Sequence, residues 1–253
     1  MSKIKNRIGE INISNEGYKM LIIECYNHKN IIVEFQDEYK ARVNCTYDNF
    51  KNGRVKNPYR RSVYGKGYLG EGKYSWSTHE KIYDEWNSML QRCYDKKYHV
   101  KQPTYTDCEV EEYLLNFQNF AQWYEENYYE IEGEKMALDK DILSKGNKIY
   151  SRNTMIFVPQ RINSLFTKCN KTRGNYPVGV NYHKGTNKLA VRCCTLEKRI
   201  NLGYFFLNEP FRAFTCYKNF KEKYIKQVAD EYKDLIPTKL YEAMYRYKVD
   251  IND

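Results

Sequence analysis

The sequence lacks the features that mark a membrane or secreted protein. No apolar run approaches the roughly 18 to 20 residues that a membrane-spanning helix needs. The segment MSKIKNRIGEINIS carries no apolar core of a secretory signal. These absences predict an intracellular chain, cytoplasmic in its host cell, with no membrane partner.

Cysteine spacing typical of metal sites is missing as well. The chain has 8 cysteines, but they include no CxxC pair. We therefore expect neither a zinc ribbon nor a disulfide framework, and interpret the thiols as reduced side chains that fill space. A phosphate-binding loop is also absent, because no GxxxxGK precedes a Ser or Thr.

Aromatic residues and positive charge are plentiful. Aromatics make up 16% of the chain, with 26 tyrosines, which argues against wholesale disorder. The net charge of +10 is unevenly distributed: +6 over 1–73, −8 over 74–134, +7 over 135–174 and +5 over 175–253. Three basic blocks indicate a polyanionic partner, although such a charge could also serve solubility alone.

The first block is expected to form a small β module. Short runs rich in Ile, Val, Phe and Tyr occur at 18–26, 30–35 and 41–47, separated by turn-forming residues. A stretch rich in glycine follows, up to residue 73. Its composition fits either phosphate contact or an interdomain hinge, and the candidate phosphate contacts are Arg54, Lys56, Arg60, Arg61 and Lys66.

Helical periodicity begins at residue 78. The apolar residues of 78–94 recur at helical spacing, with Thr78 as the expected N-cap. A second helix is expected over about 109–128, with its apolar residues on one face and its acidic residues in solvent.

Residues 135–168 read as strand, loop, strand and helix, the last opened by Pro159. This order resembles the ββα-metal finger of phage HNH endonucleases, and with the preceding helices the resemblance covers about 78–170. The matching residues are Leu138, Asp139, Lys140, Gly146, Asn147, Tyr150, Asn153 and Asn163.

The resemblance implies a divalent cation, Mg²⁺ or Mn²⁺, held by oxygen ligands from Asp139 and Asn163. The catalytic candidates are Asp139, Lys140, Asp141 and Asn153. The family's general base is a histidine directly after the strand acid, whereas this sequence has Lys140 there. Lys140 could clamp a phosphate, or Asp141 could recruit a water. Metal-dependent cleavage, and a finger kept for DNA binding or stability, both remain open.

Residues 177–207 contain three runs with the alternation of strands. The pattern places Val178, Val180 and Tyr182 on one face, and the second and third runs continue that apolar face. In the third run the alternation groups Ile200, Leu202 and Tyr204. An amphipathic helix over about 209–233 is expected to cover this face, leaving a basic face free.

This arrangement resembles the Apetala/ethylene-response-factor DNA-binding domain and its relatives fused to phage HNH endonucleases. The resemblance is carried by Gly179-Val180, Ala190-Val191-Arg192 and Leu202-Gly203 with Phe205, while the family's strand tryptophans are absent. It implies that exposed strand residues contact DNA. The candidates are Asn181, His183, Lys184, Lys188, Arg192, Lys198, Arg199 and Asn201.

The sequence therefore predicts an α+β protein of three parts: a β-rich module over 1–73, an HNH-like domain over 74–172, and an ethylene-response-factor-like DNA-binding domain over 173–253. The leading hypothesis is a phage double-stranded DNA-binding protein that acts as a Mg²⁺-dependent homing endonuclease or nickase. The alternative is a catalytically degenerate protein that regulates through DNA or inhibits a host defence protein.

Overall fold

The computed structural model describes residues 6–167, 175–251 and 253 of the 253-residue chain. It mixes helices and sheets, in agreement with the predicted α+β class. The chain divides into two compact units, Met1–Glu126 and Asn127–Asp253. The division predicted at residue 172 lies outside the described residues, and the three-part organisation stays a prediction. Among the described helices, none has the length and apolar character needed to cross a membrane.

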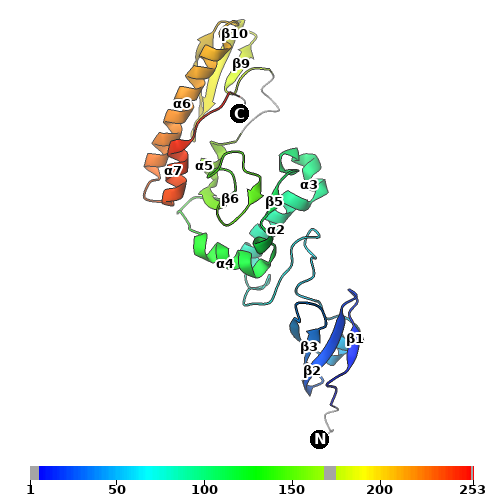
Figure 1. The fold of residues 1–253 in the computed structure, drawn as a ribbon. Helices are drawn as coiled ribbons and strands as arrows, with labels where there is room; N and C mark the ends of the chain where they lie inside the picture. The colour runs from blue at the N-terminus through cyan, green and yellow to red at the C-terminus, as the bar shows by residue number, and fades with distance from the viewer. Residues whose placement is uncertain (1–5, 168–174, 252) are drawn as a thin grey trace. The chain divides into compact units, whose positions relative to one another are not determined.

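The first unit begins with a four-stranded antiparallel sheet in the order β1-β2-β3-β4 (Figure 1). Alternate residues of the two central strands are buried, among them Met20, Ile22, Ile31 and Val33. The three predicted strands are confirmed, while a first short strand and a helix at the end of the sheet were not predicted. The elements are β1 (Ile11–Ile13), β2 (Lys19–Asn27), β3 (Asn30–Phe35), β4 (Arg42–Cys45) and α1 (Tyr47–Lys51).

Helices built around a buried tryptophan complete the first unit. Trp86 is fully buried, and its Nε1 donates a hydrogen bond of 2.9 Å to the carbonyl of Leu114. The expected N-cap of α2 was wrong. His79, rather than Thr78, occupies this position, because the Thr78 hydroxyl bonds to Ser75. The elements are α2 (Glu80–Tyr94), α3 (Lys96–Lys101), η1 (Pro103–Tyr105), β5 (Glu109–Val110), η2 (Glu112–Leu115) and α4 (Phe117–Asn127).

The predicted start of the next helix was also wrong. The helix expected over about 109–128 begins at Phe117. The segment before it turns into a short strand and a 3-10 helix, whose N–H groups bond to nearby carbonyls and to the Tyr94 hydroxyl. Tyr113, placed on the apolar face by helical spacing, is 40% exposed for this reason.

The glycine-rich stretch packs against these helices. A Cβ added at Gly67 would lie 2.4 Å from Leu90 and 2.8 Å from Trp86, so only glycine allows this approach. Gly70 and Gly72 pack in the same way against the side chains of Asn116 and Gln118. The close approach that these glycines permit is thus made to protein side chains.

The second unit begins with a pair of antiparallel strands followed by a helix. Met136 pairs with Pro159, and Asp139 with Ile156. Their buried residues share a core with two C-terminal helices, the second of which was not predicted. The elements are β6 (Met136–Asp139), β7 (Ile149–Tyr150), β8 (Ile156–Pro159), α5 (Gln160–Ser164), α6 (Pro210–Glu231) and α7 (Thr238–Arg246).

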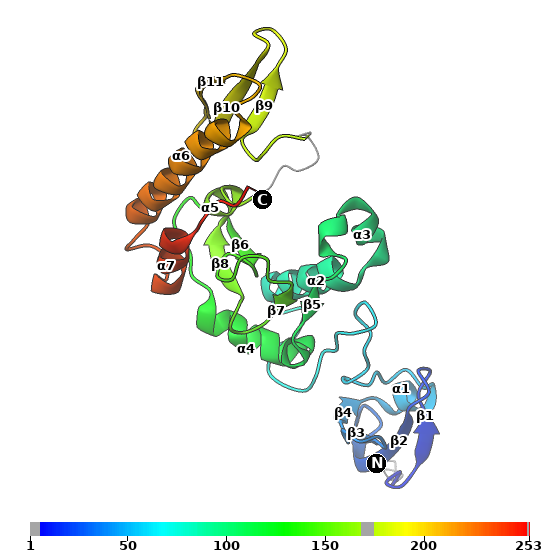
Figure 2. The ribbon, with the colours of Figure 1, turned by 45° about the horizontal axis from the view of Figure 1, so that its top comes forward.

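A three-stranded antiparallel sheet in the order β11-β10-β9 lies along α6 (Figure 2). It consists of β9 (Val180–His183), β10 (Lys188–Cys194) and β11 (Arg199–Phe205). Val180, Leu189 and Val191 pack against Ala213 and Phe214 of the helix. The three predicted strands, the long helix and its packing on the apolar face are confirmed.

One face assignment was wrong because of a β-bulge. Val191 pairs with Gly203, but the next residue, Arg192, pairs with Asn201, so one residue of β11 is skipped. Gly203 has φ 136°, a backbone conformation that glycine adopts easily. Beyond the bulge the alternation reverses: Phe205 packs toward α6, and Tyr204 moves to the opposite face.

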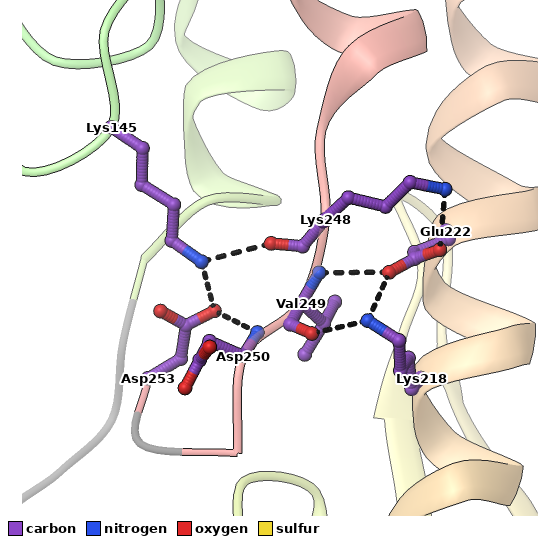
Figure 3. Close-up of polar contacts among 7 residues, drawn as sticks. All are labelled: Lys145, Lys218, Glu222, Lys248, Val249, Asp250 and Asp253. Atoms are coloured by element: carbon purple, nitrogen blue, oxygen red, sulfur yellow. Dashed lines mark hydrogen bonds and ion pairs between the residues drawn. The ribbon is translucent and has the colours of Figure 1, made fainter.

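The chain after α7 is held by hydrogen bonds to α6 and to the loop after β6 (Figure 3). Glu222 of α6 accepts hydrogen bonds from Lys218 at 2.7 Å, Val249 N at 2.9 Å and Lys248 at 3.2 Å. Burial of the Glu222 carboxyl favours its neutral form, but these three hydrogen bonds outweigh burial and hold its pKa below the usual value. Residues 248–249 are thereby fixed to the helix.

The same segment is tied to the loop by Lys145. Its Nζ donates to the carbonyl of Lys248 at 2.8 Å and to Asp253 at 2.7 Å. A cavity of about 440 Å³ lies beside these contacts. Its lysines at 145, 218 and 248 are already engaged in the hydrogen bonds described above.

Candidate nucleic-acid interface

The sheet face that points away from α6 gathers most of the predicted DNA-binding residues. The register pairs Lys188 with His183, Ala190 with Asn181, Arg192 with Asn201, and Cys194 with Arg199. Residues at these positions share a face because successive side chains alternate across a strand. Six of the eight predicted residues therefore lie on this face, which we call the sheet face: Asn181, His183, Lys188, Arg192, Arg199 and Asn201.

The two remaining candidates lie in the turns at the ends of the strands. Lys184 follows β9 and Lys198 precedes β11, and both are exposed. Arg192 and Lys188 are half-buried within the face, where neighbouring side chains limit their freedom. Two half-buried cations therefore lie inside the face, and exposed cations lie in the turns at its ends.

Two aromatic side chains that were not among the predicted DNA-binding residues also lie on the sheet face. Tyr204 is 43% exposed, and its ring contacts that of His183 with centroids 5.4 Å apart. Phe206, which is 64% exposed, lies beneath the Lys188 ammonium at 5.3 Å from its centroid. Gly203 inside a strand was the available signal, because an interior glycine often marks a bulge.

The candidate phosphate contacts of the first unit are partly neutralised by its own acids. Arg60 forms an ion pair with Glu16, and Arg61 forms one with Glu112 at 2.5 Å. Glu112 of the acidic block thus pairs with a basic side chain of the same unit. Lys66 lies over the Tyr94 ring at 5.8 Å, while Arg54 and Lys56 are exposed.

The turn after β6 is organised by Asp139. Its Oδ1 accepts hydrogen bonds from the backbone N–H groups of Asp141 at 2.9 Å and Ile142 at 2.7 Å. Burial, and then repulsion by the Asp141 carboxylate, raise the pKa of Asp139, although the two backbone hydrogen bonds oppose this. Asp139 therefore closes a turn in addition to any role in binding.

Lys140 is buried with 7% exposure, and its Nζ lies 3.4 Å from Asp141 Oδ2 and 5.7 Å from the centre of the Tyr150 ring. An ammonium held in an ion pair has no lone pair with which to accept a proton. The position does not supply a substitute for the histidine of the resembled family.

The other two candidates of the predicted finger are asparagines. Asn153 is exposed in the turn before β8, and Asn163 is half-buried on α5. Within the described residues, no hydrogen bond joins Asn163 to Asp139, and no three His, Cys, Asp or Glu side chains cluster as a metal site. The Asp139 and Asp141 carboxylates lie close enough for their charges to repel each other, and carboxylate oxygens are ligands of the kind that Mg²⁺ prefers.

Comparison with protein-family models, with curated proteins and with solved structures finds no match for this chain. The functional argument therefore depends on the geometry of the described residues.

Two variants of Asp139 separate its role as a hydrogen-bond acceptor from the effect of its negative charge. Asp139→Ala removes the acceptor of two partly buried backbone N–H groups, and we expect the free energy of unfolding to fall by about 1 to 3 kcal/mol. Asp139→Asn keeps Oδ1 and removes the repulsion from Asp141, so stability should equal or exceed that of the wild type. Urea denaturation at pH 7 measures the stability of both variants. Equal losses of stability would show that the hydrogen bonds accepted by Asp139 do not stabilise the turn.

The pH dependence follows from the raised pKa of Asp139. A carboxyl with a raised pKa binds its proton more tightly in the folded state, so its contribution to stability grows as the pH falls through that pKa. Any advantage of Asp139→Asn at pH 7 should therefore shrink on acidification.

Proposed function

We propose that this protein binds double-stranded DNA through the sheet face of β9–β11. The observation that carries the proposal is the register, which places six polar or basic candidates on the face opposite α6. Arginine can bond bidentately to guanine, asparagine can do so to adenine, and cations at the strand ends can neutralise phosphates. The resemblance of 173–253 to the ethylene-response-factor domain supports the same surface.

Arg192 tests sequence preference. We expect Arg192→Ala to reduce discrimination between an enriched and a random duplex by about 1 to 3 kcal/mol, because the side chain is half-buried on the face and arginine can read guanine. Lys198→Ala, in an exposed turn, should weaken both duplexes alike. Fluorescence anisotropy with a random duplex and with a duplex enriched from a random library measures the affinity of each variant. If Arg192→Ala, like Lys198→Ala, weakens the two duplexes equally, the face contacts only the DNA backbone.

Mg²⁺-dependent DNA cleavage is the second candidate, favoured by the neighbouring carboxylates of Asp139 and Asp141. A divalent ion bound there would neutralise charge on a scissile phosphate. The ion pair of Lys140 instead favours a finger that binds or stabilises without cutting.

The variant Asp139→Asn tests whether the finger cleaves DNA or binds and stabilises without cleavage. If the protein cuts, the variant should lose nicking of supercoiled plasmid with Mg²⁺ or Mn²⁺ while keeping its fold and its DNA affinity, because only a ligand charge is removed. Reactions with EDTA are the control. A wild type that is inactive with both metals would leave DNA binding as the function of the chain.

A further inference from the structure

The sheet face carries, near one end, an aromatic pair that spans three strands. We call His183 of β9 and Tyr204 of β11 the aromatic bridge; their rings lie 5.4 Å apart at an interplanar angle of 72°. Their strands are both neighbours of β10, so the backbones are about 9.6 Å apart. Ala190 of the middle strand is the small residue next to the bridge, and it is covered to 1% exposure.

The side-chain amide of Asn181 lies directly across the middle strand from Tyr204. Ala190 pairs with Tyr204 on one side and with Asn181 on the other, so the three residues form one row across the face. In this row Asn181 offers an amide that can donate and accept, and Tyr204 offers a partly exposed aromatic ring. The row following it contains Arg192 and Asn201 and has no aromatic group.

An A·T pair presents matching chemistry in the major groove. Adenine offers an N7 acceptor and an N6 donor, which suit an asparagine amide, and thymine offers a C5-methyl group, which suits an apolar contact. A G·C pair has no methyl group. We infer that the row Asn181–Ala190–Tyr204 reads an A·T base pair, with the Tyr204 ring against the thymine methyl and the Asn181 amide on adenine. The inference rests on the proposed DNA binding, since it needs duplex on this face.

Removal of the thymine methyl tests the contact without changing base pairing. A random duplex library is enriched on the full-length protein, and the enriched pool is then amplified with dTTP or with dUTP. We expect the uracil form to bind about fourfold more weakly for each contacted thymine, the effect of exposing one methyl-sized group. The unselected pool, amplified in the same two ways, gives the baseline.

Variants assign the effect to the ring. Tyr204→Ala should bind the thymine and uracil pools equally, and Tyr204→Phe should keep the difference because the ring remains. The matched control is Tyr182→Ala, an exposed tyrosine of the same sheet whose strand partner Leu189 faces α6. It should keep the difference as well.

Equal affinity of the wild type for the enriched thymine and uracil pools would overturn the inference while leaving DNA binding intact. Tighter Tyr204-dependent binding to single-stranded oligothymidine than to duplex would also overturn it, by showing that the ring stacks on bases. Failure to bind or enrich any duplex at low salt would reject the proposed function itself, and the inference with it.

Discussion

Duplex DNA affinity should fall by about 500-fold between about 50 and 200 mM salt if the cations of the sheet face and its turns all meet phosphates. Five residues supply this charge: Lys184, Lys188, Arg192, Lys198 and Arg199. Each neutralised phosphate contributes about −0.9 to the slope of log affinity against log salt for B-DNA, so five give about −4.5. Anisotropy titrations of a fluorescent duplex at several salt concentrations measure the slope.

Removal of the two turn cations should reduce that slope by about 1.8. The variant is Lys184→Ala/Lys198→Ala, in which both side chains are exposed outside the strands. A control of equal charge is Lys223→Ala/Lys239→Ala, on the exposed sides of α6 and α7, which should leave the slope unchanged. A slope near zero for the wild type, or equal changes in both double variants, would contradict binding at the sheet face.

Gly179→Ala should lower the free energy of unfolding of the second unit by about 3 kcal/mol, the largest expected loss of stability. Gly179 has φ 78°, and an added Cβ would lie 2.1 Å from the Tyr217 ring of α6. The substitution combines left-handed strain with a clash that displaces α6 from the start of β9. Urea denaturation monitored by circular dichroism measures the loss.

Gly146→Ala separates the two causes. Gly146 has φ 82° with nothing within 4 Å of an added Cβ, so only backbone strain of about 1 kcal/mol is expected. Tyr217→Ala in the Gly179→Ala background should cost less than the sum of the single losses, because the clash is absent. Equal losses at Gly146 and Gly179 would show that the close approach to Tyr217 is unimportant.

Much of the second unit follows from short-range patterns. The alternation in 177–205 predicts three strands, and the apolar spacing after residue 209 predicts the helix that covers them. These signals are local, because one buried face imposes a period of two on a strand and of 3.6 on a helix. The expected helix from 109 failed since tertiary hydrogen bonds, such as Val110 N to the Tyr94 hydroxyl, compete with helical ones.

The sequence by itself determined the α+β class, the strand and helix segments around 135–164 and 177–231, and the chemical character of the candidate residues. Only the tertiary structure decided which of them meet. Register placed six candidates on one face, the bulge at Gly203 added Tyr204, and ion pairs with Glu16 and Glu112 engaged Arg60 and Arg61. Local periodicity carries no information about partners distant in sequence, and such partners depend on how strands and helices pack in three dimensions.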